Sequence, residues 1–332
     1  MRPPFSRRSG YWSAPVTVKA YDPANRPILR PSSGADKVLL FDGPQQYIII
    51  DGFVLDATNI VSNAIKLTSG ASHIRIQNTE VHDSPGVGIL LTGSANFNEF
   101  INIDTHGAKN LAGSGGTYNH GIYIATSNNL LDKVRSYSNS GYGIHVYNDG
   151  GGVSNNVVRN SVAHDNGLSG RGSGIIVGSG NGNQVYNCVS YGNRDNGIYV
   201  QYGSPQGTVF YNNTAYGNGG TGILVGSDAS GTTVKNNLAY GNGSDLSDGG
   251  SGSAMSNNLT GVNPGFVNAG AGDFRLTSGS RAIDAGASVA MVSSDANGVA
   301  RPQGPAYDIG AYEFGATTAR APLAPTNVRI VK

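Results

Sequence analysis

Histidine and tyrosine residues recur in the middle of the chain at positions suited to proton transfer. Tyr123, His145 and Tyr199 each follow a Gly-Ile step, Tyr147 stands two positions beyond His145, and His120 immediately precedes the first of these steps. Imidazole and phenol groups serve as general acids and bases in enzymes. The sequence therefore indicates a site at which protons are moved.

Charged and polar residues accompany these positions. Arg171 and Lys109 stand in flanking loops, and Lys133 replaces an asparagine that other repeats carry. Cationic groups stabilise negative charge that develops on a carboxylate. The catalytic candidates are His145, His120, Tyr123, Tyr147, Lys133 and Arg171, and the candidates for substrate contact are Tyr199, Gln201, Lys109, Tyr118, Asp149 and Asp165.

No cofactor is required by the sequence, although Ca²⁺ is compatible with it. Asp149, Asp165 and Asp195 lie in the relevant part of the chain, and hard cations bind several oxygen ligands. Aspartate also has a local role in turns. Because no acidic cluster marks a metal site, the metal ligands stay unassigned.

A repeat of about 25 residues must position all of these side chains. Its clearest copies share an Asn at the start, an aromatic residue near the end and a closing Asn. Self-similarity at this period is typical of a solenoid in which each unit forms one coil. The clearest copies are residues 160–166, 187–193, 212–218 and 236–242.

The coils are expected to be built from strands. Apolar residues alternate with period two, as in Ile122 and Ile124 or Ile144 and Val146, and they are short and β-branched. The sequence lacks the long runs of Ala, Leu, Glu and Lys of a helical repeat and the Leu ladder of a leucine-rich repeat. The predicted fold is therefore all-β, a parallel β-helix.

Two columns of equivalent residues support this fold. One is asparagine, which tolerates the left-handed conformation of a tight turn and can form an amide ladder between stacked coils. The other is aromatic, and rings at the strand spacing can stack. Stacking is the simpler role for its histidines, with a metal site as the alternative. The columns are Asn78, Asn102, Lys133, Asn160, Asn187, Asn212 and Asn236, and His82, His106, Tyr137, His164, Tyr191, Tyr216 and Tyr240.

The strand after each Gly-Ile step is expected to point Ile inward and the next residue outward. This predicts one exposed surface that combines aromatic and polar side chains beside the longest insertion, residues 108–119. The alternative is that these are ordinary strand residues, since Tyr favours strands. The outward columns read Leu90, Tyr123, His145, Ile176, Tyr199 and Leu224, and, two positions on, Thr92, Ala125, Tyr147, Gly178, Gln201 and Gly226.

The repeats resemble a known group of proteins. The phrases at residues 160–167 and 213–220 are similar to the right-handed parallel β-helix repeats of the pectate-lyase-like superfamily, and especially to the catalytic module of secreted mannuronan C5-epimerases. The resemblance covers about residues 45–260. Those epimerases carry an Asp-Pro-His-Glu motif after a Tyr-Gly-Phe step. Here the Tyr142-Gly143 step is present and the acidic motif is absent.

The resemblance implies a polysaccharide lyase acting on an acidic, uronate-containing chain such as alginate or pectate. A base removes the C5 proton, a cation neutralises the carboxylate, and an acid protonates the leaving oxygen. His145 or His120 is the expected base, Tyr123 or Tyr147 the acid, and Arg171 or Lys133 the neutraliser. The alternatives are a C5-epimerase, a glycoside hydrolase and a carbohydrate-binding or adhesion solenoid without chemistry. Hydrolysis is less favoured because no paired Asp-Asp or Gly-His-Gly step is present.

Four regions are expected along the chain. Residues 1–44 form an entry or cap segment, residues 45–260 the parallel β-helix, residues 261–315 a C-terminal capping segment and residues 316–332 a linker or tail. An open end of a β-helix exposes unpaired strand edges, so each end needs a cover.

Composition bounds the partners and the compartment. The formal net charge is +1, which gives no field for nucleic acid or a membrane surface, and no apolar run is long enough to cross a bilayer. The single cysteine, Cys188, is expected to be buried and inert. Residues 1–12 lack the apolar stretch of a signal peptide, yet the composition and the resemblance indicate a secreted bacterial monomer that binds a polysaccharide.

Overall fold

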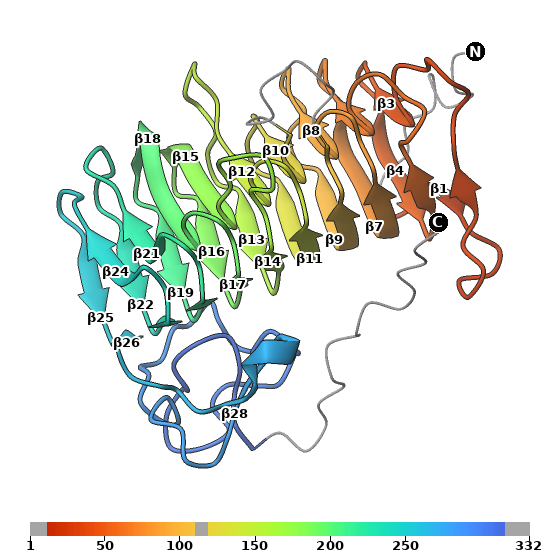
Figure 1. Ribbon diagram of the computed structural model, residues 1–332. Coiled ribbons are helices and arrows are strands. Elements are labelled where there is room, and N and C mark those ends of the chain that lie inside the picture. Colours follow the sequence, from red (N-terminus) through yellow and green to blue (C-terminus); the bar gives the residue numbers. More distant parts are fainter. Residues whose placement is uncertain (1–11, 110–118, 316–332) are drawn as a thin grey trace.

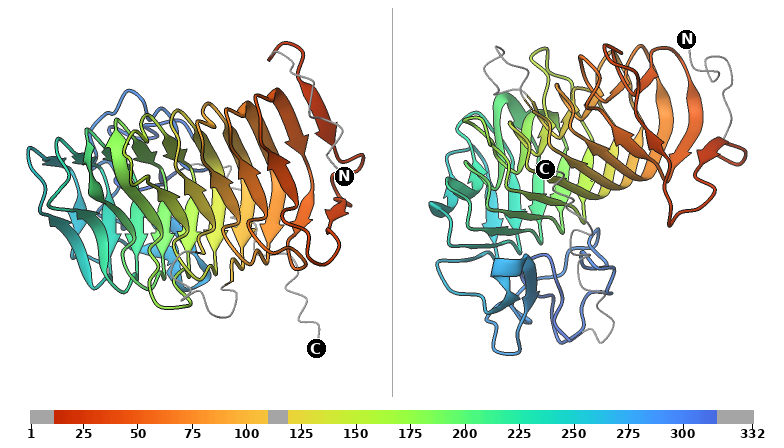
Figure 2. Two further views of the ribbon diagram at one scale, coloured as in Figure 1. Left: turned by 90° about the horizontal axis from the view of Figure 1, so that it is seen from above. Right: turned by 45° about the vertical axis from the view of Figure 1, so that its right-hand side comes forward.

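Short strands account for nearly all regular structure in the computed structural model, which describes residues 12–109 and 119–315 (Figure 1). Within these residues the one helix is the 3-10 turn η1 (Ala269–Ala271), so none of them forms a helix able to span a membrane. Successive coils lie side by side along one axis (Figure 2). The chain is the right-handed parallel β-helix that its repeat predicts.

One wall of the solenoid is a nine-stranded parallel sheet, to which each coil contributes one strand. Five of its strands, β8, β10, β12, β15 and β18, start at the Ile of a Gly-Ile step, where glycine permits the close approach of neighbouring coils. The strands are β3 (Leu39–Phe41), β6 (Ile65–Leu67), β8 (Ile89–Leu91), β10 (Ile122–Ile124), β12 (Ile144–Val146), β15 (Ile175–Asn181), β18 (Ile198–Gln206), β21 (Thr221–Val225) and β24 (Ser244–Asp248).

The remaining two walls are joined in a 17-stranded sheet, because the long strands β7, β9 and β11 continue around the corner between them. The strands are β1 (Val16–Lys19), β2 (Ile28–Leu29), β4 (Gln46–Asp51), β5 (Val54–Asp56), β7 (Ser72–His82), β9 (Glu99–His106), β11 (Leu130–Tyr137), β13 (Val157–Arg159), β14 (Val162–His164), β16 (Gln184–Tyr186), β17 (Val189–Tyr191), β19 (Val209–Tyr211), β20 (Thr214–Tyr216), β22 (Thr233–Lys235), β23 (Leu238–Tyr240), β25 (Ala254–Ser256) and β26 (Leu259–Thr260).

The predicted asparagine column forms the corner between these two walls. All seven of its residues, Lys133 included, have φ between 51° and 58°. Asparagine tolerates this left-handed conformation better than other residues with a side chain. Amides bond between coils, as from Asn102 to Asn78 at 2.8 Å, and the ladder is interrupted at Lys133 as predicted.

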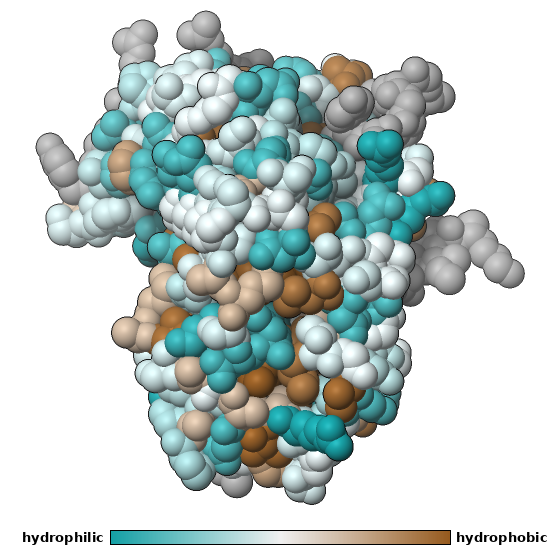
Figure 3. Space-filling model, turned by 90° about the vertical axis from the view of Figure 1, so that its left-hand side faces the viewer, coloured by the Kyte–Doolittle hydropathy of each residue, from teal (hydrophilic) through white to brown (hydrophobic). Residues whose placement is uncertain are grey.

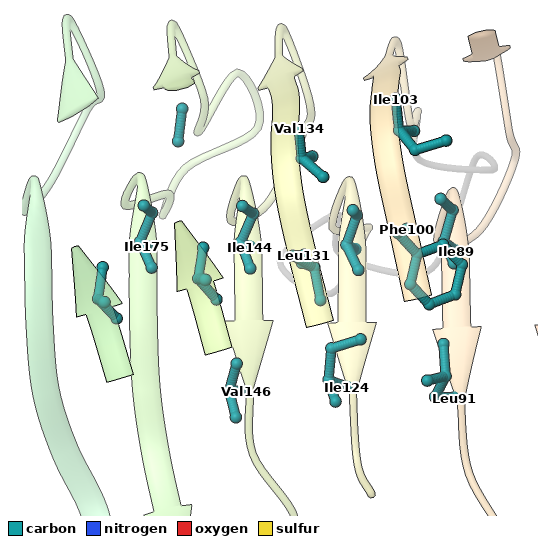
Figure 4. Close-up of a cluster of buried hydrophobic side chains, with 14 of the residues drawn as sticks. Ile89, Leu91, Phe100, Ile103, Ile124, Leu131, Val134, Ile144, Val146 and Ile175 are labelled. Carbon is teal, nitrogen blue, oxygen red and sulfur yellow. The ribbon is translucent and has the colours of Figure 1, made fainter. Parts of the chain in front are cut away.

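Stacked apolar side chains fill the interior (Figure 4). Ile122, Ile144, Ile175 and Ile198 are register partners on consecutive coils and are fully buried. Burial of this kind contributes about 1.5–3 kcal/mol for each large aliphatic side chain. Cys188 is buried as well, and burial raises the pKa of its thiol to about 12, in agreement with the prediction that it is inert.

A second asparagine ladder, formed by the closing Asn of each repeat, lies at the buried corner before the nine-stranded sheet. The side-chain amide of Asn166 donates to Asn193 at 2.9 Å, and that of Asn193 donates to Asn218 at 2.8 Å. These residues are almost completely buried. The ladder satisfies backbone groups that the tight turns leave unpaired.

The aromatic column stacks over most of its length. Neighbouring rings from His82 to Tyr191 lie with centroids 4.7–5.6 Å apart and nearly parallel. Between Tyr191 and Tyr216 the stack is entered by Phe274, which contacts both rings. This arrangement favours packing over metal binding as the role of the column histidines.

The C-terminal segment packs against one flank of the last coils (Figures 1 and 3). It contains the antiparallel pair β27 (Phe266–Asn268) and β28 (Asp273–Leu276). Hydrophobic surface gathers in the lower part of the view in Figure 3, where this segment lies. Leu276 and Ile309 pack on Leu238, and the Asn212 amide donates to the Asp308 carbonyl oxygen at 3.0 Å. The segment therefore covers the outer face of the two columns at the last coils only, for example at Asn212 and Tyr216.

Candidate functional site

The outward column of the nine-stranded sheet has the predicted register. Tyr123 pairs with His145, His145 with Ile176, and Ile176 with Tyr199. The predicted alternation of an inward Ile with an outward next residue is thus confirmed at each of these coils, although the outward residue is Ile176 in one of them. The side chains lie outside the solenoid interior, on one wall.

The prediction that this column is exposed is wrong for its central residues. His145 is 8% exposed, Tyr199 2% and His120 1%, whereas Tyr123, Tyr147 and Gln201 are half-buried. The reason is that further rings cover the outer face of the sheet. Tyr142 stacks on His120 with centroids 4.9 Å apart and meets Tyr199 edge to face.

Three rings stack along the middle of this wall. His145 lies between Tyr123, at a centroid distance of 4.7 Å, and Tyr147, at 5.4 Å, and the rings are nearly parallel. Tyr147 has room because Gly178 faces it from β15. A Cβ atom on Gly178 would lie 2.7 Å from Cδ2 of Tyr147.

Gly178→Ala is therefore expected to displace Tyr147 and to lower the free energy of unfolding by about 1–3 kcal/mol, the usual cost of overpacking. Chemical denaturation measures this loss. Gly279→Ala is the matched control, since a Cβ there meets nothing within 4 Å. Equal stability of the two variants would contradict the packing described for Tyr147.

His120 and His145 form a hydrogen-bonded pair with fixed tautomers. The Tyr142 N–H donates to Nδ1 of His120 at 3.0 Å, so the proton of this imidazole is on Nε2. Nε2 in turn donates to Nδ1 of His145 at 3.2 Å, which leaves the His145 proton on its own Nε2. Neither imidazole retains a free lone pair, so this geometry gives no support to either as the base.

Burial keeps both imidazoles neutral. It lowers the pKa of His120 to about 3, and burial together with the proximity of His120 lowers the pKa of His145 well below its usual value. A neutral His145 with its proton on Nε2 is a hydrogen-bond donor. At this site His145 can therefore donate a hydrogen bond to an anion.

Because of this histidine pair, the free energy of unfolding is expected to depend on pH. The unfolded chain takes up protons on these histidines below about pH 6.5 and the folded chain does not, so stability is complete above that pH and falls as the pH drops toward 3. Each histidine contributes a slope of up to ~1.4 kcal/mol per pH unit. Between pH 7 and 4.5 the free energy of unfolding, measured by chemical denaturation, should fall less steeply for His145→Phe than for the wild type. An equal fall in both proteins would contradict the neutral state assigned to His145.

Beside the stacked rings lies an open pocket of about 350 Å³. It is formed where the turns before β15, β18 and β21 meet the rings above β12 and β18. Its lining combines two cations, a carboxylate and three phenols. The lining residues are Tyr142, Arg171, Ser173, Arg194, Asp195, Asn196, Tyr199, Tyr202, Gly219 and Gly220.

The loop that carries Arg171 is closed tightly at its base. Gly167 and Gly172 touch there, since a Cβ on Gly172 would lie 2.1 Å from the Gly167 Cα atom. The Gly172 N–H also donates to the Asp195 carboxylate at 2.9 Å. The loop is therefore held against the next coil, with Arg171 at the pocket and exposed.

Arg171 and Arg194 form no ion pair within the described parts of the chain. Most other arginines of these regions do pair, for example Arg135 with Asp104 and Arg159 with Asp132. Two uncompensated guanidinium groups at one pocket favour an anionic ligand, because arginine matches the geometry of a carboxylate.

Three tyrosines meet at the same pocket. The hydroxyl groups of Tyr142, Tyr199 and Tyr202 interact with one another, and the rings of Tyr199 and Tyr202 lie edge to face at 6.1 Å. Burial raises the pKa of both Tyr142 and Tyr199. These two phenols therefore hold their protons and act as hydrogen-bond donors.

Tyr147 and Tyr123 are also protonated phenols. Tyr147 donates to Asp149 at 2.5 Å, and this hydrogen bond raises its pKa to about 12. Burial, and secondarily the charge of Asp149, raises the pKa of Tyr123. Their role as acids toward a leaving oxygen stays a prediction.

Several predicted residues lie apart from the pocket. Lys133 is exposed at the corner of the 17-stranded sheet, Asp165 pairs with His164 on the flank, and Lys109 pairs with Asp83. Gln201 lies in the second outward column, and Tyr118 is outside the described residues. The described residues contain no group of three or more His, Cys, Asp or Glu that could hold a metal ion.

Three of the charged or aromatic pocket residues were not among the sequence candidates: Tyr142, Arg194 and Tyr202. Arg194 had a usable signal, because it occupies a position that other coils fill with Gly167, Gly219 or another small residue. Tyr142 belongs to the Tyr-Gly step noted above. Tyr202 gave no signal in the sequence, because its direction depends on a β-bulge in β18.

Comparison with known proteins agrees with this architecture. Residues 101–260 match the family model described as "Right handed beta helix region". The fold is similar to that of pectate lyase Pel9A, with a TM-score of 0.74 and 21% identity over 92% of this chain and 81% of that one. The chain is thus a right-handed parallel β-helix protein.

Two further solved structures share the fold. The alginate lyase from Paenibacillus sp. str. FPU-7 has a TM-score of 0.58 and 21% identity, over 76% of this chain and 86% of the lyase. A mutant of the periplasmic alginate epimerase AlgG has a TM-score of 0.52 and 14% identity, over 67% and 61%. No curated protein has a significantly similar sequence.

Proposed function

We propose that this protein is a polysaccharide lyase that cleaves a uronate-containing chain by β-elimination. The observation that carries the proposal is the pocket in which Arg171 and Arg194, without ion-pair partners in the described regions, adjoin a group of tyrosines. A uronate offers a carboxylate to the cations and a sugar face to the rings. The similar folds named as pectate lyase and alginate lyase support the same class of substrate.

The residues have separate tasks in this proposal. Arg171 and Arg194 bind the carboxylate and take up the negative charge that develops on it when the C5 proton leaves. His145, with its proton on Nε2, is a further donor near the substrate. Tyr123 or Tyr147 protonates the leaving oxygen, as the sequence suggested. Lys133 has no part, because it lies on another wall.

We extend the proposal to the setting of the enzyme. A substrate of this kind is found outside cells, so we propose a secreted bacterial monomer. Ca²⁺ remains a candidate for assisting the carboxylate, through oxygens such as those of Asp195. Its removal by a chelator tests this point directly.

A panel of polysaccharides tests the proposal. Alginate, polygalacturonate and other polyuronates are each incubated with the protein, and product is followed by near-ultraviolet absorbance and by reducing ends. Elimination predicts that both signals rise together on at least one polyuronate and on no neutral glucan. Reducing ends without absorbance would instead indicate a hydrolase.

The second candidate is a carbohydrate-binding solenoid without chemistry. It is favoured by one observation, that neither imidazole has a free lone pair and that burial keeps Tyr142 and Tyr199 protonated. It predicts retention of a polyuronate on the protein with unchanged polymer length. A C5-epimerase would change the ratio of the two uronate epimers, visible by proton NMR, without cleavage.

A further inference from the structure

Tyr202 has a backbone conformation that few residues with a side chain adopt. Its φ is 108°, and such a conformation costs about 1–3 kcal/mol unless its surroundings enforce it. Strain of this kind gathers at functional sites. The position therefore calls for an explanation beyond ordinary strand geometry.

A β-bulge in β18 explains how Tyr202 reaches the pocket. Val177 pairs with Val200, but the next pair is Ser179 with Gly203, so β18 has one extra residue in this interval. Tyr199 points outward, so strict alternation along the strand would point Tyr202 inward. The bulge reverses this, and bulges commonly redirect a side chain next to an active site.

The phenol of Tyr202 is the accessible member of the tyrosine group. Its side chain is 50% exposed, whereas Tyr199 is buried and Tyr142 half-buried. Its ring lies edge to face against Tyr147 at 6.5 Å and against Tyr199 at 6.1 Å, which fixes its direction. Tyr202 also lines the same pocket as Arg171 and Arg194.

We propose that the Tyr202 hydroxyl is the proton-transfer group of the elimination, an inference that rests on the proposed lyase function. As the phenolate, it takes the C5 proton, and the electron pair of that C–H bond forms the C4=C5 double bond. The C4–O4 bond breaks, and the departing O4 takes the proton back from Tyr202. The phenolate is restored, and no other reactant is consumed.

The surroundings fit this task. Tyr142 and Tyr199 form hydrogen bonds with the Tyr202 hydroxyl, and Arg171 and Arg194 line the same pocket. The other candidates for the base are less suitable. The imidazoles of His120 and His145 have no free lone pair. Tyr142 and Tyr199 hold their protons. In this inference Tyr202 takes the place of Tyr123 or Tyr147 as the acid, so that one residue serves both half-steps and Tyr147 only supports its ring.

The test is Tyr202→Phe, which keeps the ring and removes the oxygen. We expect kcat on the preferred polyuronate to fall by about 10²–10⁴-fold, the usual contribution of acid–base catalysis. The Kd for a short oligouronate, measured by calorimetry, should change less than threefold. Tyr240→Phe, on the far flank, is the matched control and should keep full kcat.

Each outcome separates this inference from the proposed function. A wild-type protein that forms no unsaturated product on any polyuronate overturns both. A wild-type protein that does so while Tyr202→Phe retains kcat within tenfold overturns only the role of Tyr202. Loss of kcat together with an equal loss of oligouronate binding also overturns it, since the hydroxyl would then bind rather than transfer protons. Should the Phe variant fail to fold, Tyr202→Gly carries the same expectation, because glycine adopts φ 108° without strain.

Discussion

Replacement of both Arg171 and Arg194 by alanine is expected to lower kcat/KM on a polyuronate by about two to four orders of magnitude. A hydrogen bond to a charged group contributes about 1.5–3 kcal/mol, and the two guanidinium groups act on one carboxylate. Because the carboxylate gains charge as the C5 proton leaves, kcat should fall as well as binding. Initial rates of near-ultraviolet absorbance measure the effect.

Two comparisons make this result specific to the carboxylate. Arg281→Ala removes the same charge from an exposed position in the C-terminal segment and should leave the rate unchanged. A methyl-esterified substrate should be cleaved more slowly by the wild type, yet esterification should make little difference to the double variant. A double variant within threefold of the wild-type rate would contradict the role of the arginines.

Asn193→Ala is expected to produce the largest loss of stability. The Asn193 amide donates to the Ala163 carbonyl oxygen, to Ser190 Oγ and to Asn218 Oδ1, and its own oxygen accepts from the backbone and side chain of Asn166. All of these groups are buried, and each group left unsatisfied costs about 1–3 kcal/mol. A loss of about 3–5 kcal/mol in the free energy of unfolding is therefore expected, measured by urea denaturation.

The exposed corner column supplies the control for this variant. Asn102→Gly removes a single exposed amide contact, to Asn78, at a left-handed residue whose conformation glycine adopts easily. It should cost about 1 kcal/mol or less, the net value of one ordinary hydrogen bond. If Asn193→Ala were no more destabilising than Asn102→Gly, the buried ladder would not have the role described.

The fold and the register of the nine-stranded sheet could be predicted because both depend on local alternation. Once Ile144 faces inward, His145 must face outward, and stacking of equal coils aligns it with Tyr123 and Tyr199. The left-handed corner was predictable for the same reason, since Asn recurs where the backbone needs that conformation.

The burial of the outward residues could not be predicted from alternation. Whether His145 is covered depends on rings that reach over it from other positions, such as Tyr142. Tyr202 was missed because one extra residue in β18 reverses its direction, and the sequence contains no mark of that bulge. The mutual orientation of His120 and His145, which fixes their tautomers, is equally a property of the folded chain.

A crystal structure of the Tyr202→Phe variant soaked with a short oligouronate tests the central claim most directly. The account predicts a uronate carboxylate between Arg171 and Arg194, with its C5 hydrogen facing the ring at position 202. An oligosaccharide bound along another wall of the solenoid, with both arginines left in solvent, would contradict it.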